Sequence, residues 1–381
     1  MTRDQRGGLH DLGAEFARRE VTPNLQEWED AGEVPRALHL AAAKHGLLGV
    51  GFSEEVGGEG GALADVVAVA EGMLAEGASS GLLAALFTGG IALPHLARHG
   101  SPDLIDRYVR PTLAGELIGS LGITEPDGGS DVAHLRTTAR RDGDHYVVNG
   151  AKTFITSGVR ADFITTAVRT GGPGGRGVSL LVIDKAVPGL TVTRDLRKMG
   201  WHCSDTAELS FVDVRVPVAS LVGEENAGFG YIAEAFVTER IGLAVHAYGI
   251  AARSLALTAA YCRERSTFGD ALIGRQVVRH RLVEMHRQVE VARAYTHAVV
   301  HQYDAEGSTP ATIAAAALAK QTAVEASQYV CDAAVQLHGG TGYMHGTEVE
   351  RHYRDTRILP IGGGATEVMT DLAATLLGYA R

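Results

Sequence analysis

The chain has 381 residues, of which 45% are hydrophobic and 21% charged, and it carries a formal net charge of −10. This composition excludes an intrinsically disordered chain, a collagen and a disulfide-rich scaffold, and the length favours two or three sub-domains. Because the balance is acidic and no dense run of Lys and Arg occurs, the sequence argues against nucleic acid as the main partner.

Residues 1–119 are predicted to form a helical domain. Apolar residues recur there at three- and four-residue spacing, which is the pattern of an amphipathic helix, as at Leu9, Leu12 and Phe16. Four glycines within residues 57–61 predict a loop in the middle of this region. After that loop we expect a helix that begins near Ala62 and runs towards Glu76.

Residues 120–223 are predicted to form a β-domain, because the pattern changes near Ile118 to short β-branched or alternating runs. These runs lie at residues 145–150, 162–170, 178–184, 190–195 and 207–217. They are separated by Asp142 with Gly143, by Asn149 with Gly150, and by the glycine-rich segment 171–177. Since Gly and Asn tolerate positive φ, each of these is predicted to form a turn.

Residues 224–381 are predicted to form a bundle of long helices. The helical runs cover residues 228–264, 276–306 and 310–337. Pro310 stands in the first turn of the last run, where its missing N–H removes no helical hydrogen bond. The order of helices, then strands, then long helices indicates an α+β multidomain architecture, and it argues against alternating βαβ units.

Several features that look like functional motifs are better explained as ordinary structure. The glycine-rich segment 57–61 lacks a Walker lysine and follows no strand, so we interpret it as a loop. His95 and His99 lie four residues apart on one helical face, but no third ligand accompanies them, so we expect a packing or surface role and no metal site. No Gly-x-Ser-x-Gly elbow is present, so nothing supports a hydrolase.

The cellular compartment is predicted from what the sequence lacks. The three cysteines, Cys203, Cys262 and Cys331, are too widely spaced for a disulfide framework and are expected to be reduced thiols. The N-terminal residues have no apolar signal core, and the most apolar stretch, residues 81–96, is interrupted and too short to span a membrane. We therefore expect a cytoplasmic protein with no membrane partner.

Five short segments carry a resemblance to a known family. They read TEPDGGSD at residues 124–131, FITSG at 154–158, MGWHCSDT at 199–206, ERSTFG at 264–269 and QLHGGTGY at 336–343. Together, and in this order, they resemble the acyl-CoA dehydrogenase family over nearly the whole chain. The resemblance implies a helical N-terminal domain, a central β-barrel-like or β-sheet domain and a C-terminal four-helix bundle, and it implies FAD as cofactor.

The first two segments match family residues at the flavin ring. The resemblance implies that the hydroxyl of Thr124 bonds the N1/O2 side of the flavin and that of Thr156 the N5 side. Phe154 stands where the family usually has a tryptophan against the ring, so an aromatic plane is kept. Ser130 corresponds to a serine beside the pantetheine and the flavin phosphates, although an isolated serine in this context is equally well explained as a turn or helix-cap residue.

A second set of residues matches family contacts to the rest of FAD, several of them made across subunits. Arg is suited to the pyrophosphate because its guanidinium donates two parallel hydrogen bonds, and glycine lets the backbone approach the nucleotide closely. The resemblance therefore implies at least a homodimer and usually a homotetramer. The set consists of Arg265, Thr267, Phe268, Gln276, Gln336, Gly339 and Gly340, with Thr366 and Glu367 expected near the adenine.

The catalytic base is expected at Glu239. In most of the family a glutamate near the C-terminus takes the α-proton, but Gly363 occupies that position here. The long-chain and isovaleryl members carry the base on the long helix, immediately before an arginine, and the run FVTER places Glu239 and Arg240 there. The alternative is a solvated helix glutamate paired with a neighbour. Gly363 keeps its N–H, which in the family holds the thioester carbonyl.

The resemblance implies an acyl-CoA dehydrogenase. Glu239 is expected to take the α-proton while the β-hydride moves to flavin N5, giving a trans-2-enoyl thioester, with Ser130 and Arg240 at the substrate. Reduced flavin is then expected to pass electrons to an electron-transfer flavoprotein. Two alternatives stay open: a same-fold flavin enzyme that acts on carrier-protein-bound acyl groups or uses oxygen, as an oxidase or N-hydroxylase, and a catalytically silent flavin- or acyl-binding protein.

Overall fold

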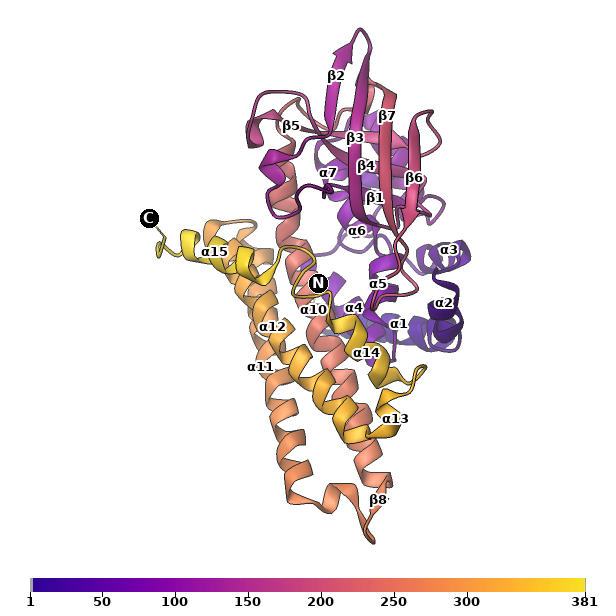
Figure 1. The fold of residues 1–381 in the computed structure, drawn as a ribbon, viewed down its shortest axis with the longest axis vertical. Helices are drawn as coiled ribbons and strands as arrows, with labels where there is room; N and C mark the ends of the chain where they lie inside the picture. Colours follow the sequence, from indigo (N-terminus) through magenta and orange to yellow (C-terminus); the bar gives the residue numbers. More distant parts are fainter. Residues whose placement is uncertain (1–2, 381) are drawn as a thin grey trace.

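The computed structural model describes residues 3–380; the sheet domain lies at one end of the long axis, the long C-terminal helices extend to the other end, and the N-terminal helices pack beside them in the middle (Figure 1). The N-terminal part is helical, and the predicted helix from Ala62 towards Glu76 is confirmed as α4. Asp304 of a distant helix accepts hydrogen bonds from the N–H groups of Leu63 and Ala64, which fixes the start of α4. The helices are α1 (Arg3–Phe16), α2 (Leu25–Ala31), α3 (Arg36–Lys44), α4 (Leu63–Ala75), α5 (Ser80–Leu86), α6 (Gly89–Ala92), α7 (Pro94–His99), α8 (Pro102–Leu104) and α9 (Arg110–Leu113).

The central part is a seven-stranded sheet in the order β1-β4-β2-β3-β7-β6, with β5 paired to β4. β1 and β4 run parallel, whereas β3 pairs antiparallel with both β2 and β7. Apolar side chains alternate along the paired strands and close one core of the domain. The strands are β1 (Gly119–Gly122), β2 (Thr138–Asp142), β3 (His145–Thr156), β4 (Phe163–Arg169), β5 (Val178–Asp184), β6 (Leu190–Asp195) and β7 (Thr206–Pro217).

One predicted turn in this sheet is wrong. Asp142 and Gly143 do connect β2 to β3, and residues 171–177 do connect β4 to β5. Asn149 and Gly150, however, lie inside β3, where the strand bulges against β7. Gly150 has a φ of 152°, and a Cβ there would lie 2.5 Å from Oγ1 of Thr137. The dipeptide therefore provides a bulge for close backbone approach and does not reverse the chain.

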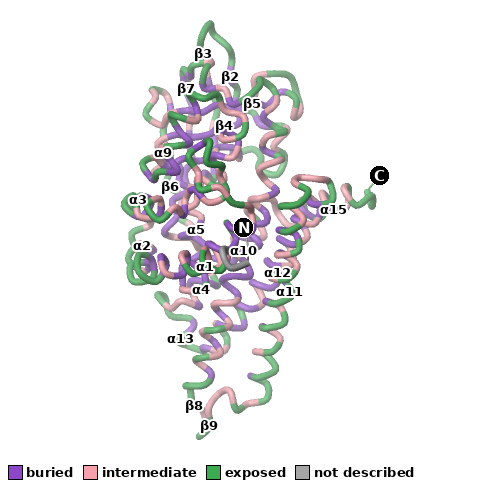
Figure 2. The backbone as a smooth tube through the Cα atoms, turned by 180° about the vertical axis from the view of Figure 1, so that it is seen from behind, coloured by how far each residue is buried: buried purple, intermediate pink, exposed green. Residues whose placement is uncertain are grey.

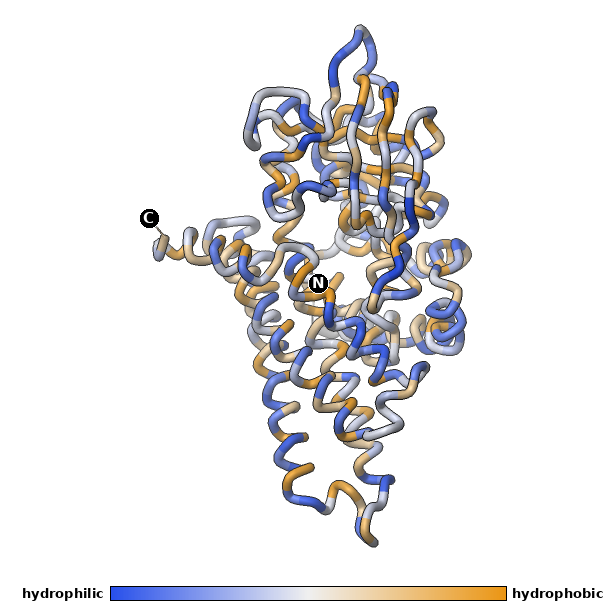
Figure 3. The backbone as a smooth tube through the Cα atoms, viewed as in Figure 1, coloured by the Kyte–Doolittle hydropathy of each residue, from blue (hydrophilic) through white to orange (hydrophobic). Residues whose placement is uncertain are grey.

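The C-terminal part is built on the three long helices that the sequence predicts. α10 begins beside β5 of the sheet domain and runs the length of the helical part, with α12 and α11 beside it (Figure 1). Apolar residues recur along these helices in Figure 3, and buried residues recur along the same helices in Figure 2, where they contribute to the main hydrophobic core. The elements are α10 (Gly228–Glu264), β8 (Ser266–Thr267), β9 (Asp270–Ala271), α11 (Gln276–Glu306), α12 (Pro310–His338), α13 (Gly340–Tyr343), α14 (Glu348–Thr356) and α15 (Thr366–Leu376).

α10 is the axis of the molecule. It is long and apolar enough to cross a membrane, but 61% of its most apolar window is buried inside the protein, which is typical of a core helix. Its side chains join the core that also includes α4, α5, α11 and α12. A helix that contacts all three parts of the fold is suited to carry side chains into a cavity between them.

Candidate active site

A cavity of about 1800 Å³ lies where the sheet domain meets α4–α7 and α10. Its volume exceeds the roughly 300–1,000 Å³ typical of a site for one small ligand, so it has room for two bulky molecules. The first set of predicted residues converges here although the residues lie far apart in the chain. The cavity is lined by Thr124, Ser130, Phe154, Thr156, Glu239, Arg240 and Gly363.

Two backbone contacts bring Thr124 and Thr156 to the same wall. The N–H of Thr153 donates to the carbonyl of Thr124 at 2.9 Å, which ties the segment after β1 to the end of β3. The hydroxyl of Ser120 donates to the carbonyl of Thr156 at 2.6 Å. Both threonine side chains remain partly exposed to the cavity, so their hydroxyls are available to a ligand.

A buried ion pair beneath this wall was not found from the sequence. Lys152 on β3 donates to Oε1 of Glu125 at 2.8 Å and to the carbonyl of Ile123 at 3.0 Å, so it holds both neighbours of Thr124. Burial lowers the pKa of Lys152 to about 8, although Glu125 opposes that shift. The pKa of Glu125 is below its ordinary value: burial raises it, but Lys152 and hydrogen bonds from the segment that includes Thr137 lower it by more.

Phe154 faces the cavity because β3 bulges at its end. The register against β7 shifts between Lys152 and Ile155, and Phe154 takes a φ of 59°. Its ring is 67% exposed, which is unusual for a large apolar side chain on a strand. A bulge that turns an aromatic ring into a cavity provides a flat surface for a planar ligand.

Glu239 on α10 and Gly363 lie side by side in the lining of the cavity. A Cβ atom added to Gly363 would lie 3.4 Å from Oε1 of Glu239, so the Glu239 carboxylate lies next to the space that a side chain at position 363 would fill. Gly363 has a φ of 64°, which favours glycine. Glu239 lines the cavity and is partly exposed, and burial raises its pKa, with Arg240 and Lys320 opposing that rise.

Two cations lie around this carboxylate. Arg240 is buried, and its Nε lies 3.5 Å from the carbonyl oxygen of Gly363. Lys320 on α12 is 2% exposed and donates to the carbonyls of Gly362 and Gly364 at 2.5 and 2.6 Å. Lys320 was not singled out from the sequence. A single lysine directly after the alanine-rich residues 314–319 is nevertheless a signal that this lysine has a specific partner.

The second set of predicted residues does not reach this cavity. These residues gather at the far end of the helical part, where α10 ends, β8 and β9 form a short hairpin, and α12 gives way to α13 (Figure 2). All are exposed except Thr267, which is half-buried, and Phe268 is 97% exposed. They are Arg265, Thr267, Phe268, Gln276, Gln336, Gly339 and Gly340. One chain therefore presents two separate sets of predicted cofactor residues.

Thr366 and Glu367 lie at the start of α15, next to the cavity wall at Ala365. The hydroxyl of Thr366 lies 3.4 Å from the carbonyl of Pro360, and the Glu367 side chain is exposed. Neither residue lines the cavity of this chain, so their predicted role near an adenine stays a prediction.

Comparison with known proteins decides the family. Acyl-CoA dehydrogenase, N-terminal domain matches residues 5–116, Acyl-CoA dehydrogenase, middle domain matches 120–214, and Acyl-CoA dehydrogenase, C-terminal domain matches 226–377. The chain belongs to the acyl-CoA dehydrogenase family. This confirms the resemblance and the three-part fold predicted for it.

Three relatives illustrate the similarity. The long-chain specific acyl-CoA dehydrogenase of Sus scrofa mitochondria is 36% identical over 374 residues, which cover 96% of this chain and 85% of the relative. The crystal structure of a probable acyl-CoA dehydrogenase from Mycobacterium abscessus is 60% identical, covers 99% of this chain and 100% of that one, and has a TM-score of 0.97. A glutaryl-CoA dehydrogenase from Mycobacterium smegmatis in complex with FADH2 is 25% identical, covers 100% and 96% of the two chains, and has a TM-score of 0.92.

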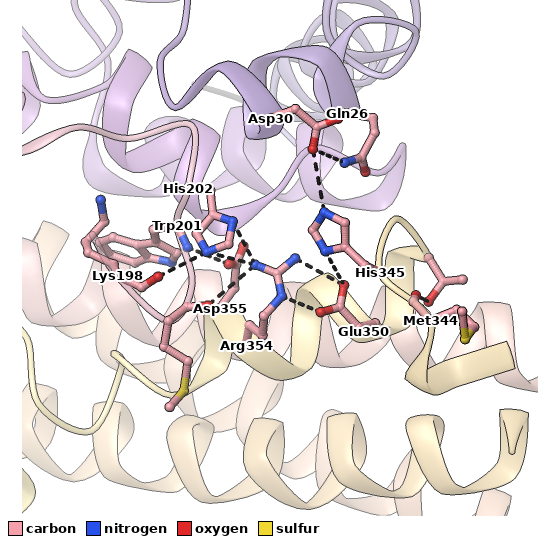
Figure 4. A network of polar contacts seen from close by, with 12 residues as sticks. Gln26, Asp30, Lys198, Trp201, His202, Met344, His345, Glu350, Arg354 and Asp355 are labelled. Atoms are coloured by element: carbon pink, nitrogen blue, oxygen red, sulfur yellow. Dashed lines mark hydrogen bonds and ion pairs between the residues drawn. The ribbon is translucent and has the colours of Figure 1, made fainter. Parts of the chain in front are cut away.

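In this member of the acyl-CoA dehydrogenase family a polar network supports the cavity wall at residues 198–201 (Figure 4). The guanidinium of Arg354 contacts the ring of His202 at 3.3 Å and the carboxylate of Glu350 at 3.1 Å, and Nε2 of His202 lies 3.1 Å from the carbonyl of Lys198. The N–H of Trp201 donates to Asp355 at 2.7 Å. The network joins the sheet domain to α14, so it fixes one wall of the cavity to the helical part.

Two further residues of this network and cavity were missed from the sequence. Asp355 is fully buried, and burial together with the charge of Glu29 raises its pKa to about 7. His246 lines the cavity two turns beyond Glu239 on α10, and its Nδ1 is buried without a hydrogen-bond partner in the described part of the chain. Burial lowers the pKa of His246 to about 4, so its ring is neutral at pH 7. Because His246 lies in a mostly apolar part of the long helix, the sequence gave no reason to single it out.

Proposed function

We propose that this acyl-CoA dehydrogenase homologue oxidises the Cα–Cβ bond of an acyl-CoA to a trans-2-enoyl-CoA, with Glu239 as the base and FAD as the cofactor. The observation that carries the proposal is the position of the Glu239 carboxylate, on the cavity wall and 3.4 Å from the Cβ position of Gly363. The base that most of the family carries at the Gly363 position is thereby replaced by a carboxylate from a neighbouring element.

The residues of the cavity fit FAD. The hydroxyls of Thr124 and Thr156 line one wall, the exposed ring of Phe154 offers a flat apolar face, and the volume of about 1800 Å³ leaves room for a second ligand. When bound, FAD supplies the acceptor for the β-hydride. The M. smegmatis relative in complex with FADH2 supports this choice of cofactor.

Glu239 is the group that takes the α-proton onto a carboxylate oxygen. Its pKa is raised by burial, which makes the carboxylate a stronger base than a solvated one, and the charges of Arg240 and Lys320 limit that rise. General-base catalysis of this kind contributes typically about 10²–10⁴-fold. The N–H of Gly363 is the donor for the thioester carbonyl, and one such donor is typically worth about 3 kcal/mol.

The substrate and partners follow from the same reasoning. Arg197 and Arg357 are exposed side chains on the cavity lining of an acidic protein, which suits an anionic substrate such as a CoA ester. The exposed residues around Arg265 lie far from Thr124, which supports an assembly in which a neighbouring subunit completes the FAD site. An electron-transfer flavoprotein is the proposed acceptor of the electrons.

Anaerobic titration of the purified protein with straight and branched acyl-CoAs tests this function. We expect protein-bound FAD whose absorbance is bleached by at least one acyl-CoA, with a 2-enoyl-CoA as product. A flavin that every CoA ester leaves oxidised contradicts the proposal, and bleaching by carrier-bound acyl groups alone, or rapid peroxide formation in air, favours one of the alternatives.

A further inference from the structure

The short segment 362–364 forms one wall of the cavity and carries the proposed amide donor. It lies between α14 and α15 and has no regular structure of its own. Gly363 and Gly364 have φ values of 64° and 103°, and no backbone carbonyl in the described part of the chain accepts from the Gly363 N–H. A segment of three glycines needs external contacts to hold one conformation, because glycine restricts the backbone least.

Those contacts come from two cations. Lys320 donates to the carbonyls of Gly362 and Gly364 at 2.5 and 2.6 Å, and Nε of Arg240 lies 3.5 Å from the carbonyl of Gly363. All three carbonyls of the segment thus face a cation. In a planar trans peptide the N–H of Gly363 points opposite to the carbonyl of Gly362, so the hydrogen bond from Lys320 to the Gly362 carbonyl fixes where the Gly363 N–H points.

Burying the ammonium group of Lys320 costs free energy, so a lysine at this position indicates a specific function. The side chain is 2% exposed, and burial lowers its pKa to about 8, with the charge of Glu239 opposing that shift. An apolar residue would fill the same space without the cost of removing an ammonium group from water. Lys320 also approaches from α12, so it adds a second cation beside Glu239 that is independent of Arg240 on α10.

We propose that Lys320 is a positioning residue for the dehydrogenation: it fixes residues 362–364 so that the Gly363 amide meets the thioester carbonyl beside the Glu239 carboxylate. The inference rests on the proposed function, because it assigns Lys320 to the same amide and the same base. Lys320 itself transfers no proton and touches no reacting atom.

The test compares Lys320→Met, Lys320→Arg and Ser327→Ala. Ser327 is a matched control, because its hydroxyl is buried on the same helix and bonds Thr356, away from residues 362–364. For Lys320→Met we expect the limiting rate of flavin reduction to fall roughly 10–100-fold, as for a catalytic group displaced by about 1 Å, with little change in acyl-CoA binding. The acid limb of the pH–rate profile moves to higher pH, because loss of the cation raises the pKa of Glu239.

In Lys320→Arg we expect the acid limb of the pH–rate profile at its wild-type position. Ser327→Ala lowers thermal stability but leaves the acid limb where it is in the wild type. A second readout needs no turnover: hydrogen exchange of the peptide that covers residues 361–365 speeds up in Lys320→Met and not in Ser327→Ala. A Lys320→Met protein with the wild-type rate and acid limb overturns the inference. A loss of rate that only follows stability, as in Ser327→Ala, also overturns it. Failure of the proposed function is recognised separately, as a Glu239→Gln protein that keeps the wild-type rate.

Discussion

The ion pair of Lys152 and Glu125 makes the strongest quantitative prediction about stability. Lys152 has a fully buried side chain and Glu125 is 7% exposed, and their contact is 2.8 Å. In Lys152→Met the carboxylate stays buried without its counter-ion, which typically costs about 3–5 kcal/mol. Because the N–H groups of Arg136 and Thr137 still donate to Glu125, at 2.5 and 2.8 Å, we expect the lower end, about 3 kcal/mol.

Urea denaturation measures this change as a lower midpoint at unchanged slope. The double variant Lys152→Met with Glu125→Gln is the matched control, and it should lose less than the sum of the two single variants, because no unpaired charge remains. Since the pair holds Ile123 and Glu125 on either side of Thr124, Lys152→Met should also retain less FAD per protein. A loss below about 1 kcal/mol with full flavin content would refute the reasoning.

Three further predictions concern Gly363, Asp355 and His246. Gly363→Ala should lose about 1–3 kcal/mol of stability, because the φ of this residue is 64° and the new Cβ would lie 2.4 Å from Cδ1 of Leu243. Adding Leu243→Val should restore part of the melting temperature. A Gly363→Ala protein that melts at the wild-type temperature would contradict this prediction. Asp355 has a pKa raised to about 7 from an ordinary 3.8, so its contribution to stability is lost as the pH rises through about 7. Asp355→Asn should therefore flatten the curve of stability against pH between pH 4 and 7. A curve as steep as that of the wild type would contradict this prediction. His246→Leu should raise kcat/KM for straight long-chain acyl-CoAs about tenfold, because it removes from the cavity a ring whose buried Nδ1 has no hydrogen-bond partner among the described residues, whereas equal values would show that the acyl chain does not pass His246.

Long elements could be predicted from the sequence because their signals are local. The helices α10 and α11 begin and end where the sequence predicts, since α10 contains no proline and α11 contains neither glycine nor proline. The turn predicted at Asn149 and Gly150 was wrong for a reason that is not local. β3 is paired on both sides there, with Thr138 opposite Asn149 and Phe211 opposite Gly150, and this pairing overrides the turn preference.

The candidate site was predictable only where family motifs mark it. Thr124, Phe154 and Thr156 belong to short recognisable segments, and they meet at one wall as expected. Lys152 and Lys320 belong to no such segment. Each acts on backbone atoms far away in the chain, and a contact over that distance leaves no periodicity or spacing that a sequence pattern can show.

Flavin bleaching by an acyl-CoA in Glu239→Gln tests the central claim most directly. Gln keeps the size of the side chain and removes its basicity, so the variant should bind FAD and substrate normally. We predict that an acyl-CoA which bleaches the wild-type flavin within seconds leaves the variant oxidised, with a reduction rate at least about 10²-fold lower. Bleaching of the variant at the wild-type rate would contradict the assignment of Glu239 as the base.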